Sequence, residues 1–233
     1  MKINILVCDW FKDILPGFMP HFPTLFYDLF NELDTHVTYQ LYDVQKGEFP
    51  EEFRPNELCV ITGSRAGAYE DHQWIKRLLE FIRQAHAAKA PMAGVCFGHQ
   101  AIAQALGGKV EASSKGWGTG IRVSKVVHPK GFEYFPNKEV SLHYNHNDQV
   151  VLLPAEAELV ATSDFCENEA FLIGDHILSF QGHPEYSIKY AQYVLESKTG
   201  ASPEVVQQAK ESLLKYTPQG LEVARWMLKL PHN

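Results

Sequence analysis

The chain has little cysteine and no long apolar run, and each shortage excludes a class of protein. Its four cysteines (Cys8, Cys59, Cys96 and Cys166) form no C-x-x-C pair and no spacing typical of a zinc site. No stretch approaches the roughly 18 apolar residues of a membrane-spanning helix, and residues 1–8 lack the features of a secretory signal peptide. We therefore expect a reduced, cytoplasmic, soluble protein with free thiols.

Positive charge is also scarce. Lys and Arg number 21 against 28 Asp and Glu, which gives a formal net charge of −7. This balance offers no electrostatic reason to bind nucleic acid or an anionic membrane, so we expect neither as a partner. The 233 residues are 45% hydrophobic, enough for a sizeable core, and no repeat or long linker divides them. We expect residues 1–233 to form a single domain.

Short apolar runs alternate with segments of helical period in the first half of the chain. The runs predict buried strands at 3–8, 37–42, 58–62 and 92–95. Apolar residues at steps of three and four predict helices over 22–33, after a turn around Pro16 and Pro20, and from Asp71 as N-cap to Ile82. A further helix follows Cys96 and ends before residues 107–108. This alternation is typical of an α/β protein with a mostly parallel central sheet and helices on both faces.

The second half is richer in β-formers. Segments 121–127, 140–144, 158–162, 170–173 and 177–180 are separated by Gly, Pro, Asn and Asp. They are predicted either to extend the sheet or to add a β-rich antiparallel ribbon. The tail predicts three helices: 186–196, one that begins at Ser202 and Pro203, and 221–230. We expect the last helix to pack on the core.

One cysteine lies where a predicted strand meets a predicted helix. Residues 94–98 read Gly-Val-Cys-Phe-Gly, the G-x-nucleophile-x-G form in which a strained turn projects its central side chain from the sheet. The positive end of the following helix favours a thiolate at Cys96, and the Phe97 N–H is placed to stabilise an oxyanion. An inert buried cysteine is the alternative. The flanking strand and helix favour a nucleophile.

A thiol nucleophile for acyl transfer needs a base and a group that orients the base. His183-Pro184-Glu185 follows the last predicted strand. Side chains two apart on an extended segment point the same way, and the proline favours an extended His183. Glu185 is thus a candidate to hold one tautomer of His183. H-P-E alone is common in ordinary loops, and only its combination with the cysteine turn makes it specific.

Together, the sequence Gly-Val-Cys-Phe-Gly-His-Gln at 94–100 and His-Pro-Glu at 183–185 resembles the class I glutamine amidotransferases. A third motif agrees, an apolar strand that ends in Thr-Gly-Ser at 62–64. The stretch 63–71 and the overall length are similar to the free-standing, GMP synthase-like branch of that family. The resemblance covers nearly the whole chain and implies the flavodoxin-like fold of the family.

The resemblance also implies roles for particular residues. Cys96 would be the nucleophile, His183 the base and then the acid, and Glu185 the residue that orients His183. The backbone amides of Gly63 and Phe97 would form the oxyanion hole.

Four further residues are candidates for substrate binding. Gln100, on the helix after the turn, would hold the amino-acid end of the substrate. Ser64 follows the oxyanion glycine. Asn145 and His146 lie where the family has a substrate-facing loop after a strand. The resemblance implies no cofactor.

Three other features have plainer interpretations. His143, His146 and Asp148 have a spacing that suggests a metal site, but no zinc motif such as H-E-x-x-H is present, and we expect no metal. Residues 116–120 are glycine-rich, which favours a flexible turn over a phosphate-binding loop. We expect His99 to pack or hydrogen-bond and not to act as the base.

The chemistry implied is cleavage of the glutamine side-chain amide through a γ-glutamyl thioester. The short stretch after Glu185 leaves no room for an ATP-using synthetase domain, so ammonia would pass to a separate synthetase partner. A stand-alone γ-glutamyl hydrolase or peptidase would use the same thioester with another leaving group. A silent binding module and a related branch of elbow-cysteine proteins are further alternatives, against which the complete Cys, His and Glu set argues.

Overall fold

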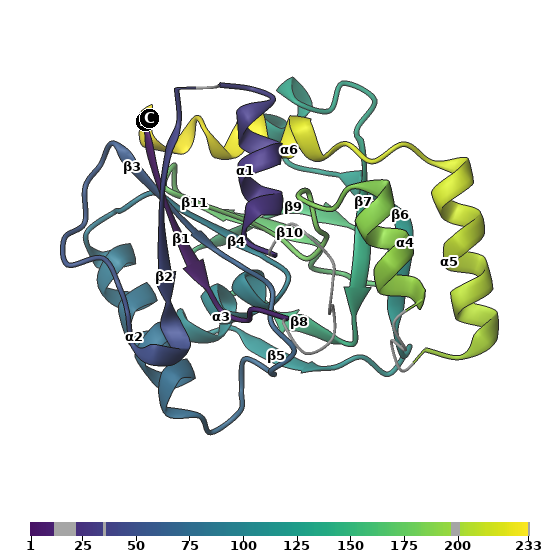
Figure 1. The fold of residues 1–233 in the computed structure, drawn as a ribbon, viewed down its shortest axis with the longest axis horizontal. Helices are drawn as coiled ribbons and strands as arrows, with labels where there is room; N and C mark the ends of the chain where they lie inside the picture. The colour runs from purple at the N-terminus through teal and green to yellow at the C-terminus, as the bar shows by residue number, and fades with distance from the viewer. Residues whose placement is uncertain (12–21, 35, 197–200, 233) are drawn as a thin grey trace.

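A nine-stranded sheet crosses the molecule, with helices on both of its faces (Figure 1). The computed structural model describes residues 1–11, 22–34, 36–196 and 201–232, and the turn expected around Pro16 and Pro20 lies outside them. The strands, in sheet order, are β2 (Thr38–Asp43), β1 (Lys2–Val7), β3 (Glu57–Ile61), β4 (Met92–Val95), β11 (Ile177–Phe180), β10 (Ala170–Ile173), β9 (Ala157–Thr162), β6 (Gly118–Val126) and β7 (Glu139–His146).

One half of this sheet is parallel. β2, β1, β3, β4 and β11 pair parallel in that order, which is the 2-1-3-4-5 order of flavodoxin-like folds. Their carboxyl ends therefore meet at one edge of the sheet, and open α/β sheets bind their ligands at this edge. The α/β fold class predicted from the alternating pattern is confirmed.

The β-rich half adopts both arrangements that the sequence allowed. β10, β9, β6 and β7 extend the sheet beyond β11 with antiparallel pairings. Two short strands, β5 (Lys109–Ala112) and β8 (Asp148–Leu152), form a separate antiparallel ribbon. β8 follows β7 after a single residue, so the chain turns sharply there and directs residues 145–148 toward the carboxyl edge of the parallel strands.

The helices divide between the two faces of the sheet. α1 (Thr24–Asn31), α4 (Ile188–Glu196), α5 (Pro203–Lys215) and α6 (Gly220–Met227) share one apolar core, which includes Ile5, Val60 and Val95 of the sheet. α2 (Gln73–Ala87) and α3 (Phe97–Ala105) cover the other face and pack on Ile61 and Met92. Because successive strand residues point to opposite faces of the sheet, the same central strands contribute side chains to both cores. Within the described ranges, no helix has the length and apolar character needed to cross a bilayer.

Two local predictions need correction. Asp71 is not the N-cap of α2, because His72 occupies that position without a side-chain cap, and the Asp71 carboxylate pairs with Lys76 instead. The glycine-rich segment 116–120 is a turn only at its start, because Gly118 already begins β6. At α5 the expected cap is confirmed: Ser202 Oγ accepts a hydrogen bond from the Val205 N–H at 3.4 Å.

Candidate functional site

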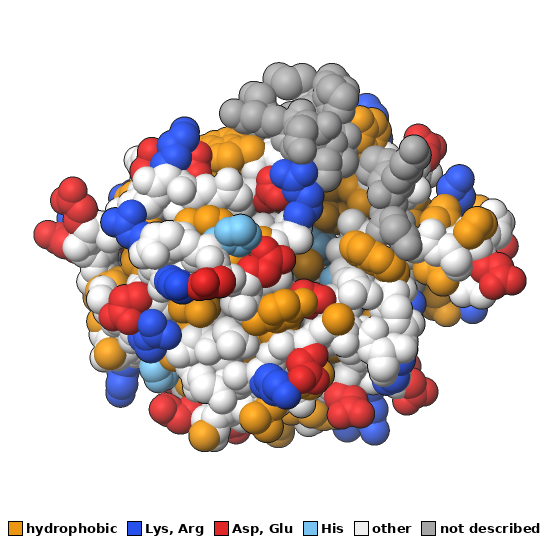
Figure 2. Space-filling view, turned by 90° about the horizontal axis from the view of Figure 1, so that it is seen from below, with side chains coloured by type: hydrophobic (Ala, Val, Ile, Leu, Met, Phe, Trp, Pro, Cys, Tyr) orange, Lys and Arg blue, Asp and Glu red, His pale blue; other side chains and the backbone are white. Residues whose placement is uncertain are grey.

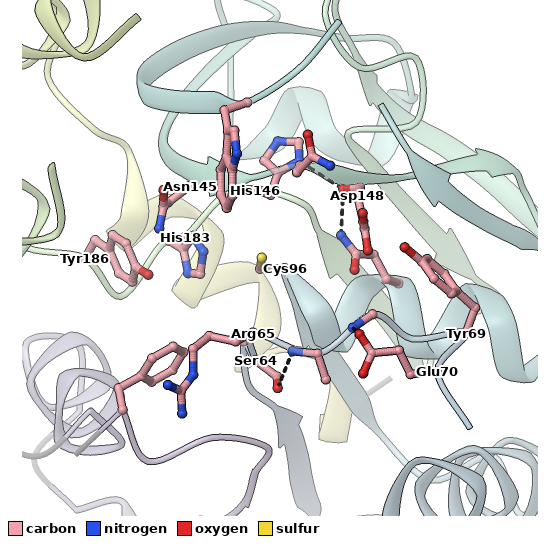
Figure 3. Close-up of a pocket in the computed structure, with 17 residues that line it drawn as sticks. Ser64, Arg65, Tyr69, Glu70, Cys96, Asn145, His146, Asp148, His183 and Tyr186 are labelled. Atoms are coloured by element: carbon pink, nitrogen blue, oxygen red, sulfur yellow. Dashed lines mark hydrogen bonds between the residues drawn. The ribbon is translucent and has the colours of Figure 1, made fainter. Parts of the chain in front are cut away.

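A pocket of about 340 Å³ opens at the carboxyl edge of the parallel strands. Figure 2 views the molecule from this side, where charged side chains of both signs border a hollow near the centre of the face. The loops after β1, β3, β4 and β11 and the β7–β8 turn all contribute to its walls. Figure 3 shows Cys96 at the middle of the pocket, with His183 beside it.

The backbone at Cys96 is strained. Its φ of 53° and ψ of −104° lie where non-glycine residues rarely occur. The two glycines of the turn permit this geometry: a Cβ on Gly98 would lie 2.1 Å from the Ile61 carbonyl oxygen, and one on Gly94 would lie 2.7 Å from the Gly98 carbonyl oxygen. The turn therefore places Cys96 between β4 and the N-terminus of α3, with only 6% of the residue exposed.

His183 and Glu185 form a buried pair. Nδ1 of His183 lies 2.7 Å from Oε1 of Glu185, and the two residues are 2% and 4% exposed. Burial disfavours the imidazolium, but Glu185 and Cys96 outweigh this effect and raise the pKa of His183 to about 10. The pair thus favours a charged His183 at neutral pH.

Gly63 lies against both the cysteine and the histidine. A Cβ at this position would be 3.2 Å from Cε1 of His183 and 3.8 Å from Cβ of Cys96. Across the ranges that the structure describes, no acceptor is found for the N–H of Gly63 or of Phe97. Two amide donors beside the sulfur of a cysteine are the arrangement that an oxyanion hole would require.

The substrate-binding candidates all line the pocket. Gln100 Nε2 donates to the Asp148 carbonyl oxygen at 2.8 Å and to Gln181 Oε1 at 3.1 Å, so this side chain ties α3 to the β7–β8 turn. Nδ1 of His146 lies 3.0 Å from the same carbonyl oxygen. Ser64 accepts a hydrogen bond from the Ala66 N–H at 3.2 Å, which stabilises the loop after β3.

Sequence reasoning missed several residues of the pocket. Arg65 donates to Asp9 from Nε at 2.7 Å and from Nη2 at 2.9 Å, and this paired contact joins the loop that carries Gly63 to the end of β1. Trp117, from the glycine-rich turn, contributes to the wall. The turn was noticed in the sequence, but nothing in it indicated that a distant strand would bring it to the cysteine.

Tyr186 is the most informative of the missed residues. Its ring stacks on that of His183, with centroids 4.0 Å apart and an interplanar angle of 18°. In the sequence, the only indication of a role for Tyr186 is its position directly after the H-P-E motif. The Tyr186 ring packs on one face of the imidazole, whereas hydrogen-bond partners such as Glu185 lie in the imidazole plane. The stack therefore fixes the plane in which His183 faces Cys96.

We expect Tyr186→Leu to lower kcat on a γ-glutamyl substrate by about 3- to 10-fold with little change in KM. An aromatic pair contributes about 0.5–1.5 kcal/mol beyond its burial, which corresponds to that range of rates. Tyr186→Phe keeps the ring and should remain near the parent value. Steady-state kinetics of the two variants measure this, and a Phe variant as slow as the Leu variant would show that the hydroxyl matters instead of the stack.

The plainer interpretation of His99 agrees with the structure. His99 is fully buried and lies 2.9 Å from Ser179 Oγ and 3.0 Å from the Asn168 carbonyl oxygen, and burial lowers its pKa to about 3. It is hydrogen-bonded inside the core, as expected. Among the residues described, no group of three or more His, Cys, Asp or Glu is arranged to hold a metal ion.

Comparisons with known proteins identify the family of this chain. The family model "Glutamine amidotransferase class-I" matches residues 27–199. Gamma-glutamyl peptidase 2 of Arabidopsis thaliana is 32% identical over 218 residues, covering 90% of this chain and 86% of that protein. Putative glutamine amidotransferase YLR126C of Saccharomyces cerevisiae is 33% identical over 205 residues, covering 83% of this chain and 81% of that protein.

A solved structure shows the same fold. A glutamine amidotransferase from Thermotoga maritima superposes with a TM-score of 0.74 over 100% of this chain and 98% of its own, at 21% sequence identity. At this identity the likeness concerns the fold alone. The family model, however, spans well over half of the residues, and the chain belongs to the class I glutamine amidotransferase family.

Proposed function

We propose that this protein hydrolyses the γ-amide C–N bond of glutamine or of another γ-glutamyl compound through a thioester on Cys96. The observation that supports this best is a cysteine on a strained strand-to-helix turn, beside a His183–Glu185 pair at 2.7 Å, in a pocket of substrate size. Membership of a family of C–N hydrolases and transferases fits the same chemistry.

The reaction proceeds in two halves. The Cys96 thiolate attacks the γ-carbonyl carbon, and the Gly63 and Phe97 N–H groups stabilise the oxyanion that forms. The protonated His183 gives its proton to the leaving nitrogen, the C–N bond breaks, and a γ-glutamyl thioester remains.

In the second half, neutral His183 takes a proton from a water molecule, and the resulting hydroxide attacks the thioester carbon. The C–S bond breaks, glutamate leaves, and the thiolate and imidazolium are restored. Glu185 stabilises the charged imidazole in the protonated states of the cycle, and it keeps the other ring nitrogen directed at the sulfur.

Two substrate classes are compatible with this chemistry. Glutamine as substrate would make ammonia the product, and we propose a separate nitrogen-accepting synthetase as partner in that case. A γ-glutamyl peptide is favoured by one observation: the relative named gamma-glutamyl peptidase 2 aligns over 90% of this chain.

The test compares glutamate release from glutamine and from glutathione under the same conditions, with Cys96→Ala as the inactive control. Faster turnover of glutathione would identify a stand-alone γ-glutamyl hydrolase. Faster turnover of glutamine would identify a glutaminase that supplies ammonia. No turnover of either, together with a Cys96 that does not react with a γ-glutamyl affinity label, would contradict the proposal and leave a silent binding module.

A further inference from the structure

The segment that joins α5 to α6 leads into a contact with residues 183–185, the H-P-E loop. This segment, residues 216–219, and the first residue of α6 fall beyond the family match, which ends at residue 199. Figure 1 shows the chain running from α5 back across the sheet to α6. Three sets of contacts connect it to the loop that carries His183 and Glu185.

The first contact is direct. A Cβ on Gly220 would lie 2.1 Å from the carbonyl oxygen of Pro184, and 3.0 Å from its carbonyl carbon. Any side chain here would overlap backbone atoms that cannot rotate away. Because residue 220 is a glycine, the first turn of α6 can pack directly against the Pro184–Glu185 peptide.

The second set fixes the segment to β7. The Gln219 N–H donates to the Ser141 carbonyl oxygen at 2.7 Å, and Gln219 Oε1 accepts from the Ser141 N–H at 3.0 Å. Ser141 Oγ donates to the Thr217 carbonyl oxygen at 2.6 Å. Ser141 is only 7% exposed, so these bonds are shielded from water and hold the segment firmly.

The third set runs from β7 to the catalytic loop. Two residues after Ser141, the His143 carbonyl oxygen accepts a hydrogen bond from the His183 N–H at 2.7 Å. One residue before His183, a Cβ on Gly182 would lie 2.7 Å from Cβ of Leu142. Residues 141–143 of β7 thus contact both residues 217–219 and residues 182–183, at the start of the H-P-E loop.

We propose that residues 217–220 act as a clamp that positions His183 and Glu185, with Gly220 as its central positioning residue. This inference rests on the proposed function, because the clamp is proposed to position the catalytic base, His183, and the carboxylate that orients it, Glu185. None of residues 217–220 lines the pocket around Cys96. The clamp limits where the loop between β11 and α4 can move, so that the imidazole stays between Cys96 and Glu185.

Gly220→Ala tests the clamp directly. The added methyl group must move the Pro184 peptide by about 1 Å, and a misplacement of this size at a catalytic group costs on the order of 10²-fold in rate. We expect kcat on the better of glutamine and glutathione to fall about 100-fold, with KM changed by less than about 3-fold. We also expect the alkaline limb of kcat/KM to move to lower pH, because a looser contact with Glu185 favours the imidazolium less.

Gly131→Ala is the matched control. Its Cβ would lie 2.6 Å from Cγ1 of Val126, which it crowds, and in ordinary contact at 3.5 Å with the ring of Trp226 near the other end of α6; no atom of Pro184 is among its nearest neighbours. We expect kcat and the pH profile of this variant to stay close to the parent values. If both variants lose the same activity at equal loss of thermal stability, general destabilisation explains the effect and the clamp is wrong.

Gln219→Ala is the second variant and decides the matter if Gly220→Ala fails to fold. It removes one acceptor from Ser141 and should lower kcat about 3- to 10-fold with the same direction of pH shift. Unchanged kinetics in Gln219→Ala and in a folded Gly220→Ala would overturn the clamp while leaving the proposed function intact. If the Cys96→Ala variant kept the turnover of the parent enzyme, that result would overturn the proposed function instead.

Discussion

Cys96→Ala is expected to abolish glutamate release, with a loss of at least about 10⁴-fold in kcat. Without the sulfur no thioester forms, and only the oxyanion hole and binding remain to assist a direct attack by water. The measurement is glutamate formed from glutamine or glutathione over hours at high enzyme concentration. Turnover within about 10-fold of the parent would assign the nucleophile to another residue.

The matched control is Cys166→Ala. Cys166 is fully buried and lies outside the pocket, and burial raises the pKa of its thiol. Cys59 behaves alike, with burial raising its pKa to about 12. We expect Cys166→Ala to keep its turnover, and we expect a thiol-directed reagent at neutral pH to label the parent and Cys166→Ala but not Cys96→Ala. Equal labelling of all three proteins would contradict the assignment.

The features that the sequence predicted well are those in which neighbouring residues determine the geometry. The turn at Cys96 needs a glycine two residues before and two after it, and the structure shows a backbone or side-chain atom within 2.7 Å of the Cβ that either glycine would add. His183 and Glu185 are two residues apart, so their contact at 2.7 Å was a local expectation too, although the chain bends at Pro184 and Glu185 where the sequence predicted an extended segment. Parallel strands were predictable from buried apolar runs separated by helices.

Features that depend on distant parts of the chain were beyond the sequence pattern. Nothing in residues 116–120 indicates that Trp117 reaches the pocket, because β6 is placed by its pairing with β7 and β9. The contact of Gly220 with Pro184 spans 36 residues and leaves no periodic signal. Asp71 is not the cap for a different reason: α2 begins one residue later than the sequence pattern indicated, with His72 in the N-cap position. A single domain over residues 1–233 and a cytoplasmic location stay predictions.

Glu185→Gln is expected to lower kcat on the order of 10²- to 10⁴-fold while the pocket keeps its shape. The amide is nearly the size of the carboxylate, but it has no charge to stabilise an imidazolium, and its N–H₂ can hold His183 in the wrong tautomer. The groups that then remain around the ring are Cys96, His143 and the Tyr186 ring. Burial disfavours the charged imidazole, so the pKa of His183 should fall well below its present value of about 10.

The pH dependence separates this electrostatic role from a structural one. A histidine whose pKa is raised on folding adds stability that is fully present below its unfolded pKa, about 6.5, and that is lost as pH rises toward the folded value of about 10. The free energy of unfolding should therefore decline between pH 7 and 10 in the parent and decline less in Glu185→Gln. In the same variant the alkaline limb of kcat/KM should move to lower pH, because His183 loses the proton it gives to the leaving nitrogen.

Glu158→Gln provides the comparison, since Glu158 also faces a histidine, with its Oε2 3.2 Å from His128 Nε2, but at an exposed site remote from the pocket. A surface pair of this kind contributes little, so neither the unfolding curve nor the rate profile should change. Parallel shifts in both variants would mean that the pH dependence reports general charge effects. A shift confined to Glu185→Gln would show that one buried carboxylate sets the charge of His183 both in the folded state and in the reaction.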